Sequence, residues 1–492
     1  MILALKTDSI VLACVLLSLF TSATATAADT QPSTQPEAEP VMLHAGPIQL
    51  KFADGELRYL RVGDREIMRR IYFGVRDVSM GTELPVFSQM EVTPGDDHFQ
   101  IHLTAACSGR SLRYDWSAEI TGSADGTIVF RVTGAAATDG TSRRIGLCVL
   151  YGAAAMGGQK FELLDKNGQI TQGQFPLLVS PTLVGKQFNT LRYSADGLKV
   201  QCGVAESPFD MEDQRNYGDS SFKAYNLLPY PYPKIAKGSH LTQTLTLSVA
   251  GAAPTTQPQW DAAATHVRIG SPIAGATFPA IGSRNTFGGA ASFVSLNQHR
   301  DKWKDSTAVT WSWTTATHLP DDDVAMENLP AIVDQAHTIK SLAPRALLQV
   351  GPISMNGRWP RIERPAGFAA AWSADALKYL AIGNVDEVAF AETTPEAQRM
   401  LTLFQPFTGK PLLDVKVEPR FASVDAFAAA DIGTTVLWLV NRSGNTQHVV
   451  IDGAPAGAVQ VIRLPTAGVP EALAAESIDL APFDVCEVTF SR

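Results

Sequence analysis

The 492-residue sequence has few charged residues, few cysteines and none of several common catalytic signatures. Lys, Arg, Asp and Glu make up only 18 % of it, and the net charge of −9 includes no basic cluster, which argues against nucleic acid and anionic membranes as partners. The five cysteines form no CxxC pair, which argues against a zinc site, and no GxSxG elbow of a serine hydrolase occurs. The glycines around Phe287 form no dinucleotide or phosphate-loop fingerprint. We therefore expect neither a metal nor a cofactor.

Hydrophobic residues make up 45 % of the sequence, with 38 glycines and 30 prolines. This composition is typical of a folded, loop-rich protein and not of a disordered one. A chain of this length is too long for a single hydrophobic core, so ~3 domains are expected.

The first 27 residues have the layout of a cleaved export signal. Lys6 precedes an apolar run over residues 10–20, and small residues follow as far as Ala27. The run is too short to cross a membrane. We expect residues 1–27 to be removed and the protein to be exported, to the periplasm or outside the cell. Lipidation at Cys14 is the alternative, because residues 11–14 resemble a lipoprotein cleavage site.

Removal of the signal leaves four widely spaced cysteines, Cys107, Cys148, Cys202 and Cys486. Most of them lie in apolar or alternating stretches, so we expect buried thiols. One disulfide is the alternative in an oxidising compartment.

Changes in composition divide the rest of the chain into five segments. Residues 28–42 are a Pro-, Thr- and Gln-rich disordered linker, and short alternating runs over 43–250 predict a large N-terminal β-sandwich. A second linker covers 251–262. Residues 263–410 alternate strand-like and helix-like stretches, which predicts about four parallel βα units, half of an eight-unit (β/α) barrel. Residues 411–492 return to a β pattern and predict a small C-terminal β-sandwich.

Polar side chains follow each strand that we expect in the α/β segment. The expected strands are 291–296, 309–313, 346–350 and 387–391, and the expected helices are 323–342 and 366–382. In parallel βα units, catalytic side chains come from the C-terminal ends of the strands. The polar residues there are, in strand order, Asn297 and Arg300; His318, Asp321 and Asp322; Arg358; and Glu392.

A strand-terminal glutamate with a His–Asp pair suits general acid–base catalysis on an ester, lactone or glycoside. We therefore predict Glu392, His318 and Asp322 as catalytic residues. Asn297, Arg300, Asp321 and Arg358 are predicted to bind substrate. Structural alternatives exist: the carboxylates of Asp321–Asp323 could cap the following helix, His318 could be a loop histidine, and Glu392 could be an ion-pair partner.

Residues 209–223 combine six charged residues with large apolar anchors. A solvated face would not need the anchors, and a core strand would not tolerate adjacent unpaired carboxylates. We expect a packed segment whose charges neutralise one another, either to hold an interface or to line a site. The predicted network consists of Glu212, Asp213, Arg215, Asp219 and Lys223.

The same segment resembles the hallmark of the bacterial D-apionate lactonase family, which runs roughly FEMEDQRNWTDASFKTY. The agreement covers residues 211–216, Asp219 and 221–223. Further stretches are similar to the family: 66–72 with 75–77, 144–150, Phe293 with 296–297 and Arg300, His318 with 321–322 and 327–328, 371–380, and 392–394.

The resemblance implies an N-terminal β-domain, a TIM-barrel-like centre and a C-terminal β-domain. It also implies opening of a sugar-acid lactone in the catabolism of apiose. The stretch 251–287 is too short for the first half of such a barrel, so we expect the barrel to be truncated. We predict an exported carbohydrate-active hydrolase of lactonase or glycosidase type. The alternative is a catalytically degenerate relative that binds a sugar or a protein without turnover. A homo-oligomer could cover the open barrel edge.

Overall fold

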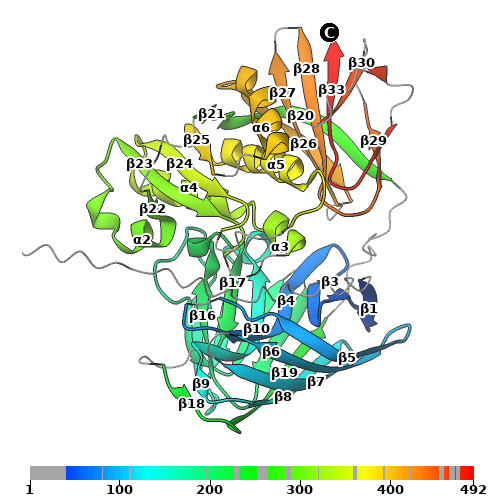
Figure 1. Ribbon diagram of the computed structural model, residues 1–492, viewed down its shortest axis with the longest axis vertical. Helices are drawn as coiled ribbons and strands as arrows, with labels where there is room; N and C mark the ends of the chain where they lie inside the picture. Colours follow the sequence, from blue (N-terminus) through cyan, green and yellow to red (C-terminus); the bar gives the residue numbers. More distant parts are fainter. Residues whose placement is uncertain are drawn as a thin grey trace, which may run out of the picture. The chain divides into compact units, whose positions relative to one another are not determined.

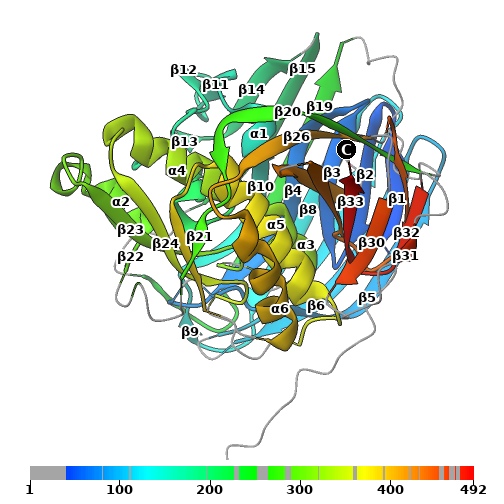
Figure 2. The ribbon, with the colours of Figure 1, turned by 90° about the horizontal axis from the view of Figure 1, so that it is seen from above.

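The chain is built mainly of β-strands, with a smaller group of helices in its second half (Figures 1 and 2). The computed structural model describes residues 40–492 except for 80, 110–111, 196, 227–231, 252–263, 283–286, 288–289, 318, 320, 358–362, 392–393, 420–422, 432, 454–458, 465–470, 473–476 and 492. The predicted signal peptide, Cys14, nearly all of the first linker and most of the second therefore lie outside the described residues.

Two large antiparallel sheets form the N-terminal β-region, as the alternating pattern predicts. The first contains, in spatial order, β1 (Val41–Ala45), β2 (Ile48–Ala53), β3 (Glu56–Val62), β4 (Arg65–Arg76), β10 (Arg144–Gly152), β17 (Ser221–Tyr225), β16 (Phe209–Asp213) and β13 (Gly185–Phe188). The second contains β12 (Ile170–Gln174), β11 (Lys160–Leu164), β14 (Thr190–Ala195), β15 (Leu198–Val204), β19 (His240–Ala250), β8 (Thr127–Ala136), β7 (Arg113–Gly122), β6 (Phe99–Ser108) and β5 (Pro85–Pro94). Smaller elements are the pair β9 (Gly140–Thr141) and β18 (Lys234–Ile235), helix α1 (Ala153–Met156) and the 3-10 turn η1 (Gln214–Tyr217).

The two sheets share one hydrophobic core. Strand β7 alternates exposed and buried residues along most of its length, because one face meets the core and the other meets solvent. Strand β10 is buried at every position, from Arg144 to Gly152. A strand buried on both faces must be covered on its outer side by another part of the protein.

The second half contains a five-stranded parallel sheet in the order β21 (Ala280–Ile281), β25 (Glu387–Phe390), β24 (Leu347–Ser354), β23 (Ala308–Thr314) and β22 (Ala291–Ser292). Its helical elements are α2 (Phe293–Gln298), η2 (Arg300–Lys302), α3 (Asp322–Glu327), α4 (Ala331–Leu342), α5 (Phe368–Ile382), α6 (Pro395–Phe404) and η3 (Gln405–Phe407). Parallel strands with intervening helices agree with the predicted βα pattern.

Two predicted elements in this region were wrong. The stretch 291–296, expected as a strand, forms only the two residues of β22 and then the helix α2. A short apolar run does not distinguish a strand from a buried helix by its periodicity. The single helix expected over 323–342 is two helices, α3 and α4. Pro330 separates them, since proline lacks the amide hydrogen that a continuous helix would need.

A nine-stranded sheet forms the C-terminal region. Its order is β31 (Glu471–Ala472), β30 (Val459–Leu464), β33 (Val485–Ser491), β28 (Thr434–Asn441), β27 (Val424–Asp431), β26 (Pro411–Glu418), β20 (Thr265–Thr277), β29 (Gln447–Ile451) and β32 (Ser477–Leu480). Strand β20 comes from the start of the segment expected to be α/β, and it pairs with β26 and β29. Helix α5 lies against this sheet, and the parallel and C-terminal sheets share a core (Figure 2).

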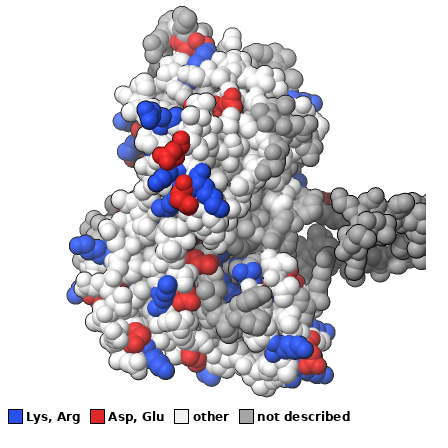
Figure 3. Space-filling view, turned by 90° about the vertical axis from the view of Figure 1, so that its left-hand side faces the viewer, with Lys and Arg blue, Asp and Glu red and all other residues white. Residues whose placement is uncertain are grey.

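The described surface carries charges of both signs. On the face shown in Figure 3, Lys and Arg side chains lie beside Asp and Glu, and most of the surface is uncharged. In the described part of the chain, no helix is long and apolar enough to span a membrane, and no cluster of His, Cys, Asp and Glu could hold a metal ion. Cys107, Cys148 and Cys202 are buried free thiols, and Cys486 is also buried.

Candidate active site

The charged segment expected from the sequence forms β16, η1 and β17 in succession. The Asp213 carboxylate accepts a hydrogen bond from the Arg215 amide and so caps η1. Gly218 ends the turn at φ 88°, and a Cβ there would lie 2.0 Å from the Thr314 carbonyl oxygen. Glycine is required because it permits this backbone conformation and the close approach of η1 to the end of β23.

Arg215 is a buried hub of this segment. Its Nε and one Nη donate to the Asp213 carboxylate at 2.9 and 2.7 Å, and the other Nη lies 3.3 Å from an Asp334 oxygen. The guanidinium also donates to the carbonyl oxygens of Pro176, Leu177 and Leu178. The side chain therefore ties the N-terminal region to α4 and fixes residues 176–178.

The predicted substrate-binding residues Asn297 and Arg300 belong to the same hydrogen-bond network as η1. The Asn297 amide donates to the Asn216 side-chain oxygen at 2.7 Å, and Arg300 donates to the Asn297 oxygen at 2.6 and 2.8 Å. Both also donate to the Val179 carbonyl oxygen. Asn297 is only 1 % exposed, so in this structure its amide is used within the chain.

The remaining predicted site residues are placed only in part. His318, Arg358 and Glu392 lie outside the described residues. Asp321 caps α3 by accepting a hydrogen bond from the Val324 amide at 2.7 Å, which is the structural role given above as the alternative to substrate binding. Asp322 pairs with Arg364. Burial raises the pKa of Asp322, and Arg364 partly offsets this.

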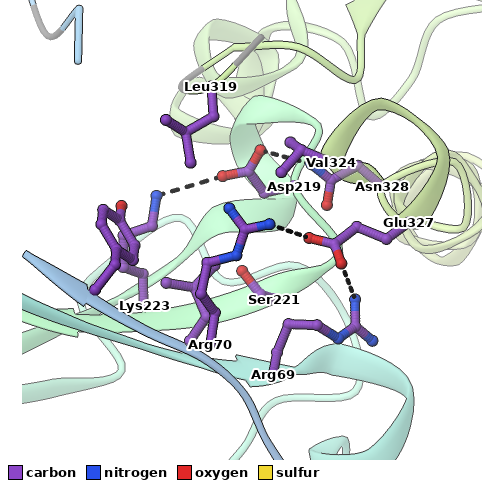
Figure 4. A pocket seen from close by; sticks show the side chains of 11 residues that line it. Arg69, Arg70, Asp219, Ser221, Lys223, Leu319, Val324, Glu327 and Asn328 are labelled. Atoms are coloured by element: carbon purple, nitrogen blue, oxygen red, sulfur yellow. Dashed lines mark hydrogen bonds and ion pairs between the residues drawn. The ribbon is translucent and has the colours of Figure 1, made fainter. Parts of the chain in front are cut away.

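Helix α3 covers the outer face of β4, β10 and β17 and encloses a small recess with them (Figures 1 and 4). The recess is lined by Arg69, Arg70, Tyr72, Leu150, Asp219, Ser221, Lys223, Leu319, Val324, Glu327 and Asn328. The space open to the centre of a water molecule is about 10 Å³, enough for roughly one water. Two segments that the sequence singled out, about 100 residues apart, thus meet at one recess.

Strand register arranges the floor of the recess. Arg70 of β4 is the register partner of Leu150 in β10, and Leu150 is the partner of Lys223 in β17. The two cations therefore flank an apolar residue on neighbouring strands. Ser221 lies two residues before Lys223, and side chains two residues apart share a face of a strand.

Glu327 faces the two arginines from the end of α3. Its carboxylate oxygens lie 3.6 Å from Arg70 and 3.8 Å from Arg69 (Figure 4). Burial raises the pKa of Glu327, and Arg70, Arg69 and a hydrogen bond with Tyr59 partly offset the effect. Tyr59 has φ 54°, a conformation that a residue with a side chain adopts at a cost and that often occurs at functional sites.

Asp321 also contacts Arg70 of the recess and a further arginine, Arg58. Its carboxylate lies 3.5 Å from Arg58 and 3.8 Å from Arg70. Burial opposes ionisation of Asp321, but the two arginines and the helix amide outweigh it and lower its pKa.

Lys223 lies at the other end of the recess. Its Nζ donates to the Gln214 side-chain oxygen at 3.1 Å and lies 3.4 Å from an Asp219 oxygen. The other Asp219 oxygen accepts from the Asn328 amide at 3.1 Å. Burial lowers the pKa of Lys223 to about 8, although Asp219 acts in the opposite direction. A lysine with this pKa is partly neutral near physiological pH and can accept a proton.

Sequence reasoning did not select Arg69, Arg70 or Glu327 as site residues. A signal existed, because two adjacent arginines interrupt the apolar run of residues 67–73, and Glu327–Asn328 fall within a stretch similar to the lactonase family. Lys223 and Asp219 were expected in a network, and the structure places both at the recess.

Comparison with known proteins gives two matching domains. Residues 28–252 match the N-terminal domain of D-apionate lactonase, and residues 422–488 match its C-terminal immunoglobulin-like domain. The chain belongs to the D-apionate lactonase family. A D-apionate lactonase from Brucella anthropi is 29 % identical over 217 residues, which is 43 % of this chain and 36 % of the relative. The match thus spans about a third of that lactonase.

The similarity of this chain to solved structures is weaker than its similarity to the lactonase family. A β-arabinopyranosidase covers 91 % of this chain and 100 % of its own at 10 % identity and a TM-score of 0.29. The match to a putative aldose 1-epimerase from Escherichia coli covers 43 % of this chain and 99 % of the epimerase, with 11 % identity and a TM-score of 0.30. The match to a Paenibacillus polymyxa xyloglucanase covers 38 % of this chain and 47 % of the xyloglucanase, with 9 % identity and a TM-score of 0.29. Scores this low establish neither a common fold nor a common function.

Proposed function

We propose that the protein is a hydrolase that opens a small sugar-acid lactone whose carbonyl oxygen enters the recess between α3 and the N-terminal sheet while its ring stays outside. The family supports a lactonase-like activity. The observation that carries the proposal is the burial of Lys223 and Arg70 on either side of Leu150, facing one recess. Buried groups with a perturbed pKa beside a cationic group are typical of catalytic sites. We also keep the proposal that the parallel sheet is part of a truncated (β/α) barrel.

The proposed reaction needs a proton acceptor and a group that stabilises negative charge. Water attacks the lactone carbonyl carbon while neutral Lys223 accepts a proton from it. The carbonyl oxygen becomes an oxyanion, which Arg70 stabilises. The bond between the carbonyl carbon and the ring oxygen then breaks, and the ring oxygen takes the proton back from Lys223. The product is an open-chain hydroxy acid, and no group of the protein is changed.

The role of Lys223 fixes the pH dependence. The lysine must be neutral to accept a proton, so kcat/KM should rise with pH through about 8 and level off above it. Asp219→Asn removes a negative charge that favours the protonated lysine. The rising limb should therefore move to lower pH in this variant. Spontaneous lactone hydrolysis at alkaline pH must be subtracted from each rate.

The residues predicted from strand ends are a competing set within the same function. Glu392 and His318, with Asp322, remain a prediction, as does substrate binding by Asn297, Arg300, Asp321 and Arg358. Glu392→Gln keeps the size of the side chain and removes a base, so it separates the two sets.

The test is a screen of four- to six-carbon aldonolactones and aryl glycosides with four proteins: wild type, Lys223→Met, Glu392→Gln and the control Lys186→Met, whose lysine is exposed on β13. We expect lactone turnover by wild type and by the control, and a loss of ~10²-fold or more in Lys223→Met. A loss only in Glu392→Gln would move the site to the strand ends. Binding without turnover by wild type would favour the degenerate binding module.

A further inference from the structure

Arg70 and Arg215 are equally buried but use their guanidinium groups differently. Arg215 donates hydrogen bonds from each of its three nitrogens. In Arg70, which is 1 % exposed, Nε and both Nη atoms have no hydrogen-bond acceptor among the described residues. Carboxylate oxygens of Glu56, Glu327 and Asp321 lie 3.2, 3.6 and 3.8 Å away, as ion pairs that are not aligned as hydrogen bonds. A buried donor without an acceptor has lost its hydrogen bonds to water and gained none in return, which is unfavourable.

A second unused polar group lies at the same recess. The Ser221 hydroxyl is buried and has no hydrogen-bond partner among the described residues. Figure 4 shows Ser221 and Arg70 directed toward the middle of the recess, with Lys223 at its side. Arg70, Ser221 and Lys223 can thus all donate hydrogen bonds into the recess, and its carboxylates, Asp219 and Glu327, already pair with Lys223 and with Arg69 and Arg70.

The size of the recess limits what can occupy it. The space open to the centre of a water molecule, about 10 Å³, takes roughly one oxygen atom and not a sugar ring. A ligand can therefore place only a head group there, with the rest of the molecule outside. Donors from arginine, serine and lysine around so small a space suit one oxygen of a carboxylate, because hydrogen bonds from a guanidinium to a carboxylate are charge-assisted and strong.

We propose that the recess binds the carboxylate of a small hydroxy acid, with Arg70 and Ser221 as its hydrogen-bond donors. Carboxylate binding itself needs no turnover. The choice of hydroxy acids rests on the proposed function, because lactone hydrolysis releases them. The open acid should then compete with the lactone and inhibit its hydrolysis.

The experiment measures binding by calorimetry at constant ionic strength, with glycolate and threonate as acids and erythritol as a polyol without a carboxylate. We expect both acids to bind and erythritol not to bind. Ser221→Ala should weaken threonate binding several-fold and Arg70→Met by ~10-fold or more, since each removes a donor. Arg131→Met, at an exposed position on β8, is the control and should bind like wild type. If Arg70→Met does not fold, as judged by circular dichroism, Ser221→Ala decides.

Equal binding of erythritol and threonate, or no binding of either acid, would overturn the inference. Unchanged threonate binding by Ser221→Ala and a folded Arg70→Met would also overturn it. The two proposals fail separately. Turnover of a lactone without acid binding would remove the carboxylate site and keep the hydrolase. Acid binding without turnover of any lactone would keep the carboxylate site and remove the hydrolase.

Discussion

Replacement of Arg215 by methionine tests whether the charged segment is a structural unit. Methionine retains an apolar stem of similar length but removes every hydrogen bond of the guanidinium. Among the described residues, the Asp213 carboxylate, 0 % exposed, would then keep as donors only the backbone amides of Ser180 and of position 215. The carbonyls of residues 176–178 would also lose their donor.

The expected cost follows from the uncompensated charge. Removing one partner of a buried ion pair typically costs about 3–5 kcal/mol. A domain of 150–250 residues loses about 2–4 °C of Tm per kcal/mol, so the N-terminal region should melt about 6–20 °C lower. The two amides that remain on Asp213 favour the lower end. Differential scanning calorimetry measures the shift, with the exposed Arg131→Met as the control.

A double-mutant cycle separates the pair from its surroundings. Asp213→Asn removes the charge that Arg215→Met leaves unpaired, so the double variant should be more stable than the sum of the single changes predicts. Additive effects would mean that the carbonyl contacts matter more than the ion pair. A Tm of Arg215→Met within a degree or two of wild type would refute the buried-hub interpretation altogether.

Two further predictions concern other parts of the chain. Burial raises the pKa of Asp375 in α5 to about 7 despite its ion pair with Arg442, so the folded state binds its proton more tightly than the unfolded state. Stability should therefore fall as pH rises from about 4 to 7, and Asp375→Asn should flatten that fall in urea denaturation measured across this range. For the export signal, amino-terminal sequencing of protein recovered outside the cytoplasm should start near Ala28, and an intact Met1 there would contradict cleavage.

The sequence predicts the sheets of the N-terminal region well because one face of most strands meets solvent. The alternation in β7 is visible without any knowledge of its neighbours. Strand β4 breaks this rule, since it is buried along most of its length and meets α3 at the recess. Arg70 is therefore buried, although two adjacent arginines in the sequence would suggest an exposed position. The acids that compensate Arg70 include Glu327, more than 250 residues later. Only the tertiary fold brings them together.

Predictions in the second half failed where pairing is non-local. Strand β20 pairs with β26 and β29, whose sequence positions lie about 150 residues or more away, so a boundary drawn from composition could not place it in the C-terminal sheet. The recess residues Asp219 and Lys223 were recognised as part of a network because charge and apolar anchors alternate in one short segment. Whether such a network holds an interface or lines a site depends on what covers it. In the structure Arg215 reaches α4, so the segment holds an interface, and Lys223 faces the recess that we propose as the site.

In a complete (β/α) barrel the active site lies at the C-terminal ends of the strands. The two faces of the parallel sheet in this chain bear on whether the site must lie there. Val309, Trp311 and Trp313 of β23 turn one face into the hydrophobic core. On the other face, Thr310 donates to Gln349 at 2.8 Å, and Gln349 donates to Glu387 at 2.8 Å.

These three side chains form one row across neighbouring strands and are only partly buried. In a closed barrel, the inward face is packed mainly with branched apolar side chains. Because these polar side chains hydrogen-bond to one another, this face does not have to be buried against an apolar surface. It therefore gives no support to the predicted homo-oligomer, which stays a prediction. The buried Arg70 guanidinium and Ser221 hydroxyl, which have no hydrogen-bond partner among the described residues, lie instead at the recess beside α3, and this is why we propose the chemistry there.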